Sequence, residues 1–295
     1  MLTIVKLIIY YFGYQLGFSV VAMLASKYIA PMDLTMTTSV AMVTSTVVMM
    51  WHLLHFKYVD LSRDKYREVS RQVLLVSIVF VFAAMYVLNL LIEKAGIPNT
   101  MEDTFIEMSR NPLGLLSIAL LAPILEEMLF RGSIEGYLLK AWKSPWGAII
   151  VSSLVFGVVH MNPAQIPFAF LLGVMFGWLY YRTGSLLPGI IGHVLNNSVA
   201  AVNMILYGDI PLEEQVQDET MMWTWAAIAT VAFVLATLWL NRRLGAGIPV
   251  GEAKTPTGSI EEPVANPEDP VVSPEVPVVK SRENRDADGY QRSER

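Results

Sequence analysis

Long apolar stretches separated by short polar segments constrain the fold of this chain more than any other feature. A helix needs about 20 predominantly apolar residues to cross the hydrocarbon layer of a bilayer. Stretches of roughly this kind occur at residues 5–26, 34–56, 73–92, 113–136, 146–161, 165–182, 185–207 and 222–241. The sequence therefore predicts an all-α, polytopic membrane protein with about eight transmembrane helices.

The composition agrees with a lipid environment. Hydrophobic residues make up 54% of the chain and charged residues only 16%, whereas soluble domains average about 25% charged residues. The chain has no cysteine, which excludes disulfides and thiolate chemistry and leaves His, Asp and Glu as metal ligands. The net charge of -5 comes with no basic surface typical of nucleic-acid binding. The expected surroundings are the lipid bilayer, with no nucleic-acid partner.

The distribution of Lys and Arg predicts an orientation. With both termini in the cytoplasm, the outside loops carry only Lys27, Lys94 and Arg110. The inside loops then carry Lys57, Arg63, Lys65, Arg67, Arg71, Lys140, Lys143, Arg182, Arg242 and Arg243. This bias follows the positive-inside rule. With no organelle-targeting segment visible, we expect a multi-pass protein of the cell (plasma) membrane with both termini cytoplasmic.

The composition changes at about Leu244. Residues 244–295 are rich in Pro, Glu, Ser and Asp and contain one aromatic residue, Tyr290. Such a segment cannot bury enough apolar surface to fold by itself. The predicted organisation is a transmembrane helical domain over residues 1–243 and a disordered, Pro-rich and acidic cytoplasmic tail over residues 244–295.

Two adjacent glutamates interrupt the apolar stretch at 113–136. A carboxylate at bilayer depth costs roughly 2.5–3.5 kcal/mol even on insertion scales, so it usually faces a partner, a cavity or a reaction. Glu127 and Arg131 have i,i+4 spacing on one helix face and can form a buried ion pair. Glu126 points elsewhere around the helix, which suits a general base. Pro123 removes a backbone hydrogen bond just before the pair and is expected to bend the helix.

Two further apolar stretches carry isolated polar side chains. His160 ends the stretch WGAIIVSSLVFGVVHM, one turn after Phe156. Taken alone, a histidine in such a place is more often a packed core residue than a functional one. His193 and Asn197 again have i,i+4 spacing, so both can point to one spot. A glutamate base, two histidines and an asparagine on successive apolar helices are the parts needed for attack of water on a carbonyl.

These segments resemble the motifs of a known family. EEMLFR at 126–131, FGVVH at 156–160 and HVLNN at 193–197 are similar to the EExxxR, FxxxH and HxxxN motifs of the CPBP family, also called the Abi family. Its members are CAAX-processing and bacteriocin-processing intramembrane proteases, including type II CAAX prenyl endopeptidases. The resemblance covers about residues 112–207.

The resemblance implies roles for the motif residues in a buried polar catalytic cavity. By this resemblance, Glu126 with His160 activates a water molecule, and His193 with Asn197 stabilises the oxyanion. The remaining motif residues support the site structurally: Glu127, Arg131 and Phe156.

Two mechanisms stay open. In one, Glu126, His160 and His193 bind one Zn²⁺, which lowers the pKa of its bound water to about 7. In the other, no metal is used, and His193 and Asn197 donate hydrogen bonds to the developing oxyanion. Asn197 favours the metal-free version slightly, because an amide is a good hydrogen-bond donor. The expected cofactor is therefore none or one Zn²⁺.

We therefore expect an intramembrane endopeptidase, either a metalloprotease or a glutamate-dependent protease. Its substrate partner would be a peptide or protein at the membrane, such as a CAAX-like tail or a leader or bacteriocin-type peptide. One alternative is a non-catalytic membrane scaffold or bacteriocin-immunity protein. The other is a proton-coupled transporter, which would also place Glu, His and Arg within the membrane.

Overall fold

The computed structural model describes residues 2–59, 69–216 and 218–250. All regular secondary structure in these residues is helical, which confirms the predicted all-α class. The α-helices before the glutamate pair are α1 (Leu2–Tyr28), α2 (Leu34–His55), α3 (Arg71–Lys94), α4 (Glu102–Arg110) and α5 (Pro112–Leu116). The helix then continues through π-helical and α-helical segments: η1 (Ser117–Leu121), α6 (Ala122–Glu126), η2 (Glu127–Glu135) and α7 (Gly136–Ala141). The remaining α-helices are α8 (Pro145–Val158), α9 (Gln165–Thr183), α10 (Leu187–Tyr207), α11 (Leu212–Val216) and α12 (Glu219–Arg243).

Each predicted transmembrane stretch coincides with a helix of this series. Within the described residues, six helical segments are long and apolar enough to cross a membrane. They are α1, α2, α3, the continuous run from α5 to α7 (Pro112–Ala141), α10 and α12. The chain is thus a multi-pass membrane protein. Helix α8 is apolar but has only 14 residues, and α9 is not among the six, so the predicted count of eight spans stays a prediction.

Polar and glycine residues define where several helices begin and end. The Asp33 carboxylate accepts a hydrogen bond from the backbone N–H of Met36 at 2.7 Å and caps α2. Asn111 and Ser144 cap α5 and α8 in the same way, each followed by a proline at the first helical position. Both features satisfy or remove N–H groups that have no partner within the helix. Gly184 ends α9 with a φ of 67°, a left-handed conformation that glycine adopts without strain.

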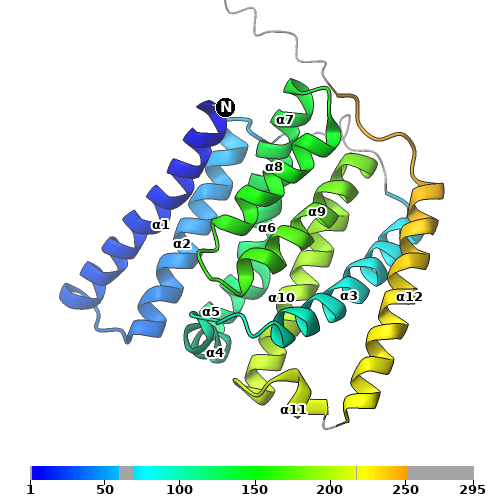
Figure 1. Cartoon of the computed structure of the whole chain (residues 1–295). Helices are drawn as coiled ribbons and strands as arrows, with labels where there is room; N and C mark the ends of the chain where they lie inside the picture. The colour runs from blue at the N-terminus through cyan, green and yellow to red at the C-terminus, as the bar shows by residue number, and fades with distance from the viewer. Residues whose placement is uncertain (1, 60–68, 217, 251–295) are drawn as a thin grey trace, which may run out of the picture. The chain divides into compact units, whose positions relative to one another are not determined.

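The helices pack as pairs around the segment that carries the glutamates. Helix α1 packs along α2, and α3 packs along α12, while α8 and α9 form a hairpin (Figure 1). Helix α10 contacts α3, α4, α6, α9 and η1. The glutamate-bearing segment therefore has α2, α8, α9 and α10 as its neighbours, which removes most of its side chains from the surrounding lipid.

The turn between α8 and α9 is tied to the segment before α4. The side chain of Asn162, fully buried in this turn, accepts a hydrogen bond from the Thr100 N–H at 3.2 Å. It also donates a hydrogen bond to the Asn99 side chain at 2.7 Å. These contacts satisfy the polar atoms of the Asn162 side chain within the protein.

Residues 244–250, which we call the strap, differ from the predicted solvated tail. The N–H of Ile248 donates a hydrogen bond to the Tyr181 carbonyl at 2.9 Å. Arg182 donates hydrogen bonds to the carbonyls of Gly245 and Leu244, both at 2.8 Å. The strap is therefore attached to the end of α9, and the boundary of the compact part lies beyond the predicted position at Leu244. The rest of the predicted tail, residues 251–295, lies outside the described residues.

Candidate active site

The glutamate pair lies at a junction between α-helical and π-helical backbone. The N–H of Ala122 donates to the carbonyl of Ser117, and the N–H of Gly136 donates to the carbonyl of Arg131, both with i→i+5 spacing. The next donor after Ala122 in this pattern is Pro123, which has no N–H. Such π-helical turns are rare and occur frequently at functional sites. At Pro123, where the sequence predicted a bend, the structure thus shows a change from π-helical to α-helical backbone.

Asn197 compensates for the missing donor. Its side-chain amide donates a hydrogen bond to the Ile118 carbonyl at 2.9 Å, the carbonyl to which Pro123 would have donated in the π-helical pattern. Its side-chain oxygen accepts a hydrogen bond from Asn196 at 2.8 Å. Asn197 therefore joins α10 to η1 in this structure, and its predicted pairing with His193 at an oxyanion stays a prediction.

Glu127 and Arg131 form the predicted ion pair. The Nη1 atom of Arg131 lies 3.0 Å from Oε1 of Glu127, and each side chain is only 1% exposed. The guanidinium also lies 4.3 Å from the ring centre of Phe156 and 5.4 Å from that of Phe176. Such contacts with aromatic faces stabilise a cation that is removed from water.

His193 lies between the two glutamates. Its Nδ1 atom is 3.0 Å from Oε1 of Glu127, and its Nε2 atom is 3.6 Å from Oε2 of Glu126. Because the Glu127 carboxylate is paired with an arginine, it accepts hydrogen bonds, so Nδ1 of His193 carries the proton. The Nε2 atom then faces Glu126 at a distance too long for a direct hydrogen bond.

Glu126 is the more accessible of the two glutamates. Its side chain is 13% exposed, compared with 1% for Glu127. Glu127 has an arginine and a histidine on one oxygen, whereas Glu126 has only the more distant His193 ring among its described polar contacts. The two adjacent carboxylates therefore differ in environment in the direction predicted from their positions on the helix.

His160 lies just beyond the end of α8. Its Nδ1 atom is 2.8 Å from the Phe156 carbonyl. A carbonyl only accepts hydrogen bonds, so Nδ1 carries the proton and Nε2 has a free lone pair. The Phe156 ring touches both histidines, at centroid distances of 4.9 Å to His160 and 5.8 Å to His193. The described residues show no direct hydrogen bond between His160 and Glu126.

The proposed zinc ligands do not form a ready metal site in this arrangement. In the part of the chain that the structure describes, no three His, Asp or Glu side chains are grouped as ligands for one ion. The Nδ1 atom of His193 is already bonded to Glu127, and its Nε2 atom faces Glu126 directly. A histidine that donates Nδ1–H to a carboxylate can still bind a metal through Nε2, so the predicted set of Glu126, His160 and His193 around Zn²⁺ stays a prediction, and we derive no chemical step through a metal.

Two residues of this region were not found from the sequence. Phe176 of α9 stacks on the His193 ring at 5.2 Å and also faces Arg131. Glu135, the last residue of η2, is fully buried. Glu135 could have been found from its i,i+4 spacing to Arg131. Phe176 could not, because nothing in the sequence distinguishes it from the other aromatic residues of α9.

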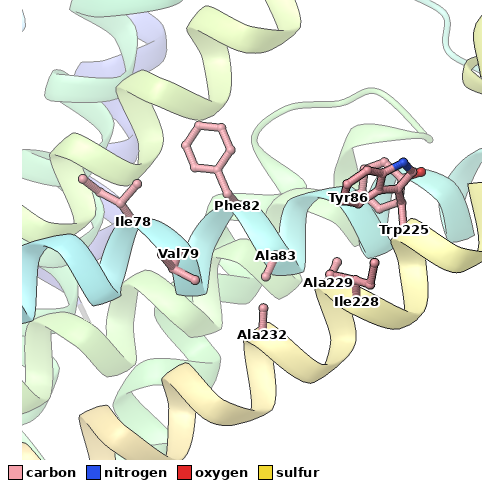
Figure 2. A pocket seen from close by; sticks show the side chains of 9 residues that line it. All are labelled: Ile78, Val79, Phe82, Ala83, Tyr86, Trp225, Ile228, Ala229 and Ala232. Carbon is pink, nitrogen blue, oxygen red and sulfur yellow. The ribbon is translucent and has the colours of Figure 1, made fainter.

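An apolar groove between α3 and α12 is separate from this cluster (Figure 2). It is lined by Ile78, Val79, Phe82, Ala83, Tyr86, Trp225, Ile228, Ala229 and Ala232. None of these side chains is a carboxylate, histidine or thiol, and the Tyr86 hydroxyl donates a hydrogen bond to the Met222 carbonyl at 3.3 Å, so the groove does not bring several reactive groups together. The candidate active site is the buried Glu–His–Arg cluster of η2, α8 and α10.

The fold and this cluster define a class: a multi-pass helical membrane protein with an ionisable site among its helices. Residues 109–199 match the family model described as Type II CAAX prenyl endopeptidase Rce1-like. Over these residues the chain is therefore similar to the Rce1-like type II CAAX prenyl endopeptidase family, and the resemblance inferred from the three motifs is confirmed.

Two bacterial relatives are similar to part of this chain. The "Membrane-embedded CAAX protease MroQ" of Staphylococcus aureus (strain USA300) is 34% identical over 114 residues, which cover 37% of this chain and 46% of the relative. The "Putative membrane peptidase YdiL" of Bacillus subtilis (strain 168) is 31% identical over 91 residues, which cover 31% of this chain and 37% of the relative. The matches thus span less than half the length of each relative. No solved structure matches the chain.

Proposed function

We propose that this protein is an intramembrane endopeptidase that hydrolyses a peptide bond near the membrane surface. The observation that carries the proposal is His193, which lies between Glu126 and Glu127 while Arg131 pairs with Glu127. The match of residues 109–199 to a prenyl endopeptidase family supports the same reaction class.

In the proposed mechanism, Glu126 is the general base. It takes a proton from water as the water oxygen attacks the carbonyl carbon of the scissile bond. Its partial exposure gives water access, and its lack of an arginine partner keeps its oxygens available. When the tetrahedral intermediate collapses, the C–N bond breaks, and the proton on Glu126 passes to the leaving amine.

His193 is the proposed donor to the oxyanion. Its Nδ1–H is held by Glu127 at 3.0 Å, which fixes the ring plane. In the doubly protonated ring, Nε2–H donates a hydrogen bond to the negative oxygen that develops next to Glu126. A donor that is already oriented stabilises this charge without reorganisation during the reaction.

His160 and Asn197 complete the proposal. The free Nε2 lone pair of His160, set by the hydrogen bond from Nδ1–H to Phe156, can assist Glu126 in accepting the water proton. Asn197 supports the site by its hydrogen bond to Ile118, and it joins His193 at the oxyanion only if its amide turns away from that carbonyl.

The proposed substrate is a peptide segment at the membrane, such as a CAAX-like C-terminal tail or the leader of a bacteriocin-type peptide. The name of the relative MroQ states that it is a CAAX protease, which supports the first of these. Of the two mechanisms we propose the metal-free one, and the chelation experiment below tests it against the zinc mechanism.

The test compares the wild type with Glu126→Gln in liposomes that contain a fluorescent membrane-anchored peptide. Glu126→Gln keeps the side-chain volume but removes the base, so we expect cleavage to fall by roughly 10²–10⁴-fold with an unchanged melting temperature. Treatment of the wild type with a chelator, followed by measurement of bound metal and activity, separates the two mechanisms. Full cleavage by Glu126→Gln would contradict the assigned base.

A matched variant controls for loss of charge. Glu107→Gln removes a carboxylate of α4 whose partner is the Thr35 hydroxyl, away from the site, and we expect normal cleavage. The non-catalytic scaffold is favoured if the wild type cleaves no membrane-anchored peptide and if the wild type and Glu126→Gln bind a partner equally well. Proton-linked uptake that survives Asn197→Ala would favour a transporter.

A further inference from the structure

Glu135 is a buried carboxyl group that the proposed mechanism does not use. It is 0% exposed, and neither of its carboxylate oxygens has a hydrogen-bond partner among the described residues. It lies in the helical run that crosses the membrane. A group of this kind is costly unless a partner compensates it.

Glu127, Arg131 and Glu135 follow one another at four-residue spacing in η2, so they lie along one side of the helix. Arg131 lies four residues before Glu135 and four residues after Glu127, so it stands between two carboxylates on the same helix. Its Nη1 atom donates to Glu127 at 3.0 Å, whereas its Nε and Nη2 atoms have no partner among the described residues. Two side-chain nitrogens of Arg131 are thus without a hydrogen-bond partner among the described residues, and so are both carboxylate oxygens of Glu135.

Two glycines of α9 lie beside these unpartnered atoms. A Cβ atom at Gly173 would lie 3.2 Å from Nη2 of Arg131, and a Cβ atom at Gly177 would lie 2.5 Å from Oε2 of Glu135. The two glycines have i,i+4 spacing, so they share one face of α9 about 6 Å apart. Nη2 of Arg131 and Oε2 of Glu135 therefore face the same stretch of α9, where the two glycines have no side chain; we call it the Gly173–Gly177 strip.

We propose that Glu135 is a positioning residue that holds Arg131 from the side opposite Glu127, with water along the Gly173–Gly177 strip completing the hydrogen bonds. Nη2 of Arg131 and Oε2 of Glu135 face this strip, and Nε and Oε1 of the same side chains also have no partner among the described residues, so a bridging water would find polar atoms of both residues to bond to. The effect on catalysis rests on the proposed function. Oε1 of Glu127 serves both Arg131 and His193, so a guanidinium held from both sides keeps the His193 ring in place.

Glu135 is expected to act on the chemical step and not on substrate binding. Among the described residues no hydrogen bond joins Glu135 to Glu126, His160 or His193, so we expect it to act on the reacting atoms through Arg131. A loosened Arg131 would let Glu127 and then His193 shift, and small displacements of a catalytic group are costly. For Glu135→Gln we expect a kcat about 10-fold lower with an unchanged KM.

The experiment is a double-mutant cycle of Glu135→Gln with Arg131→Lys in the full-length protein, read by kcat, KM and melting temperature. Lysine keeps the charge but offers a single nitrogen instead of the planar fork, so it cannot serve both carboxylates at once. We expect Glu135→Gln to lower kcat about 10-fold and the melting temperature by about 3 °C in the wild type. In the Arg131→Lys background we expect Glu135→Gln to change kcat and melting temperature little further, because the effects of mutations at interacting residues do not add. Glu107→Gln is the control and should change neither value.

Equal effects of Glu135→Gln in both backgrounds, or a higher KM with normal kcat, would overturn the proposal. The melting-temperature cycle does not require activity. If the wild type cleaves nothing, the proposed function fails, while coupling between positions 131 and 135 still supports the contact and additivity still rejects it.

If Arg131→Lys does not fold, the cycle is run with Gly177→Ala, whose Cβ displaces the Glu135 carboxylate. Glu135→Gln should then cost less in the Gly177→Ala protein than in the wild type, and an equal cost counts against the proposal.

Discussion

At the scale of single residues, Arg131 stands between the two buried glutamates of the described site, Glu127 and Glu135. It pairs directly with Glu127, precedes Glu135 by four residues, and has Phe156 and Phe176 against its guanidinium. A buried charge left without its partner is more damaging than the loss of the pair as a whole. Arg131 is therefore expected to stabilise the fold as well as the site.

We predict that Arg131→Ala lowers the stability of the protein by about 3–5 kcal/mol, because it leaves Glu127 buried and unpaired. Thermal unfolding in detergent, followed by circular dichroism, measures this loss. Arg110→Ala, at the exposed end of α4, is the control and should lie within about 0.5 kcal/mol of the wild type. An Arg131→Ala protein with normal stability and no cleavage would instead assign Arg131 to the chemistry.

The predictability of the site from sequence differs from residue to residue. The Glu127–Arg131 pair follows from i,i+4 spacing on one helix, and the structure confirms it. The contact of His193 with Glu127 joins residues 66 positions apart. It depends on how α10 packs against η2, so spacing alone could not predict it. The bond from Asn197 to Ile118 was equally out of reach, because it depends on a carbonyl that only the π-helical backbone leaves free.

At the scale of secondary structure, the segment from Pro112 to Ala141 alternates between α-helical and π-helical turns. Apolar periodicity predicted one helix with a bend at Pro123, and it could not distinguish 3.6 from a larger number of residues per turn over so short a stretch. The missing N–H of Pro123 and the amide of Asn197 compensate each other. The π-helical backbone next to the glutamates therefore depends both on Pro123 of α6 and on Asn197 of α10.

We predict that Pro123→Ala maintains or raises the melting temperature but lowers cleavage. The new N–H at position 123 can donate to the Ile118 carbonyl, which competes with Asn197 and favours a different register of the helix. Alanine is also the better residue in a helix interior, by about 3 kcal/mol. Thermal unfolding and cleavage measured on the same preparation test this. Unchanged cleavage would show that the π-helical register does not matter for activity.

At the scale of the whole chain, the ends of α2, α9 and α12 meet at one side of the membrane domain. Gly132 packs against Val59 after α2 and against Leu186 after α9, and Arg182 bonds to Asn241 at the end of α12. The sequence-based topology places all these ends in the cytoplasm. The assignment of this side, and of the plasma membrane, stays a prediction.

Reporter fusions test the orientation. We expect fusions of a cytoplasm-active fluorescent protein after Val250 and at the N-terminus to be bright, because the positive-inside rule places both ends there. A fusion in the acidic loop at 209–211 should be dark with the same reporter and active with a periplasmic or extracellular one. Bright signals at both Val250 and this loop would be incompatible with the predicted topology.

The strap is bonded to the end of α9 on this side of the domain. Arg182 makes hydrogen bonds to Gly245, Leu244 and Asn241 at 2.7–3.1 Å, each worth about 1 kcal/mol net. We predict that a chain ending after Arg243 melts several degrees lower than a chain ending after Val250, and that Arg182→Ala has a similar effect. Equal melting temperatures for the two truncated chains would mean that the strap contributes nothing to stability.

The shortness of α8 also affects the surrounding bilayer. Its 14 residues amount to about 21 Å, compared with a hydrocarbon layer of about 30 Å, and the turn that follows is closed by Asn162 and Asn99. This mismatch is relieved where the lipid thins locally or where protein covers the helix end. His160 lies just beyond that end, so local thinning of the bilayer around α8 would shorten the distance that water must travel to reach the proposed general base.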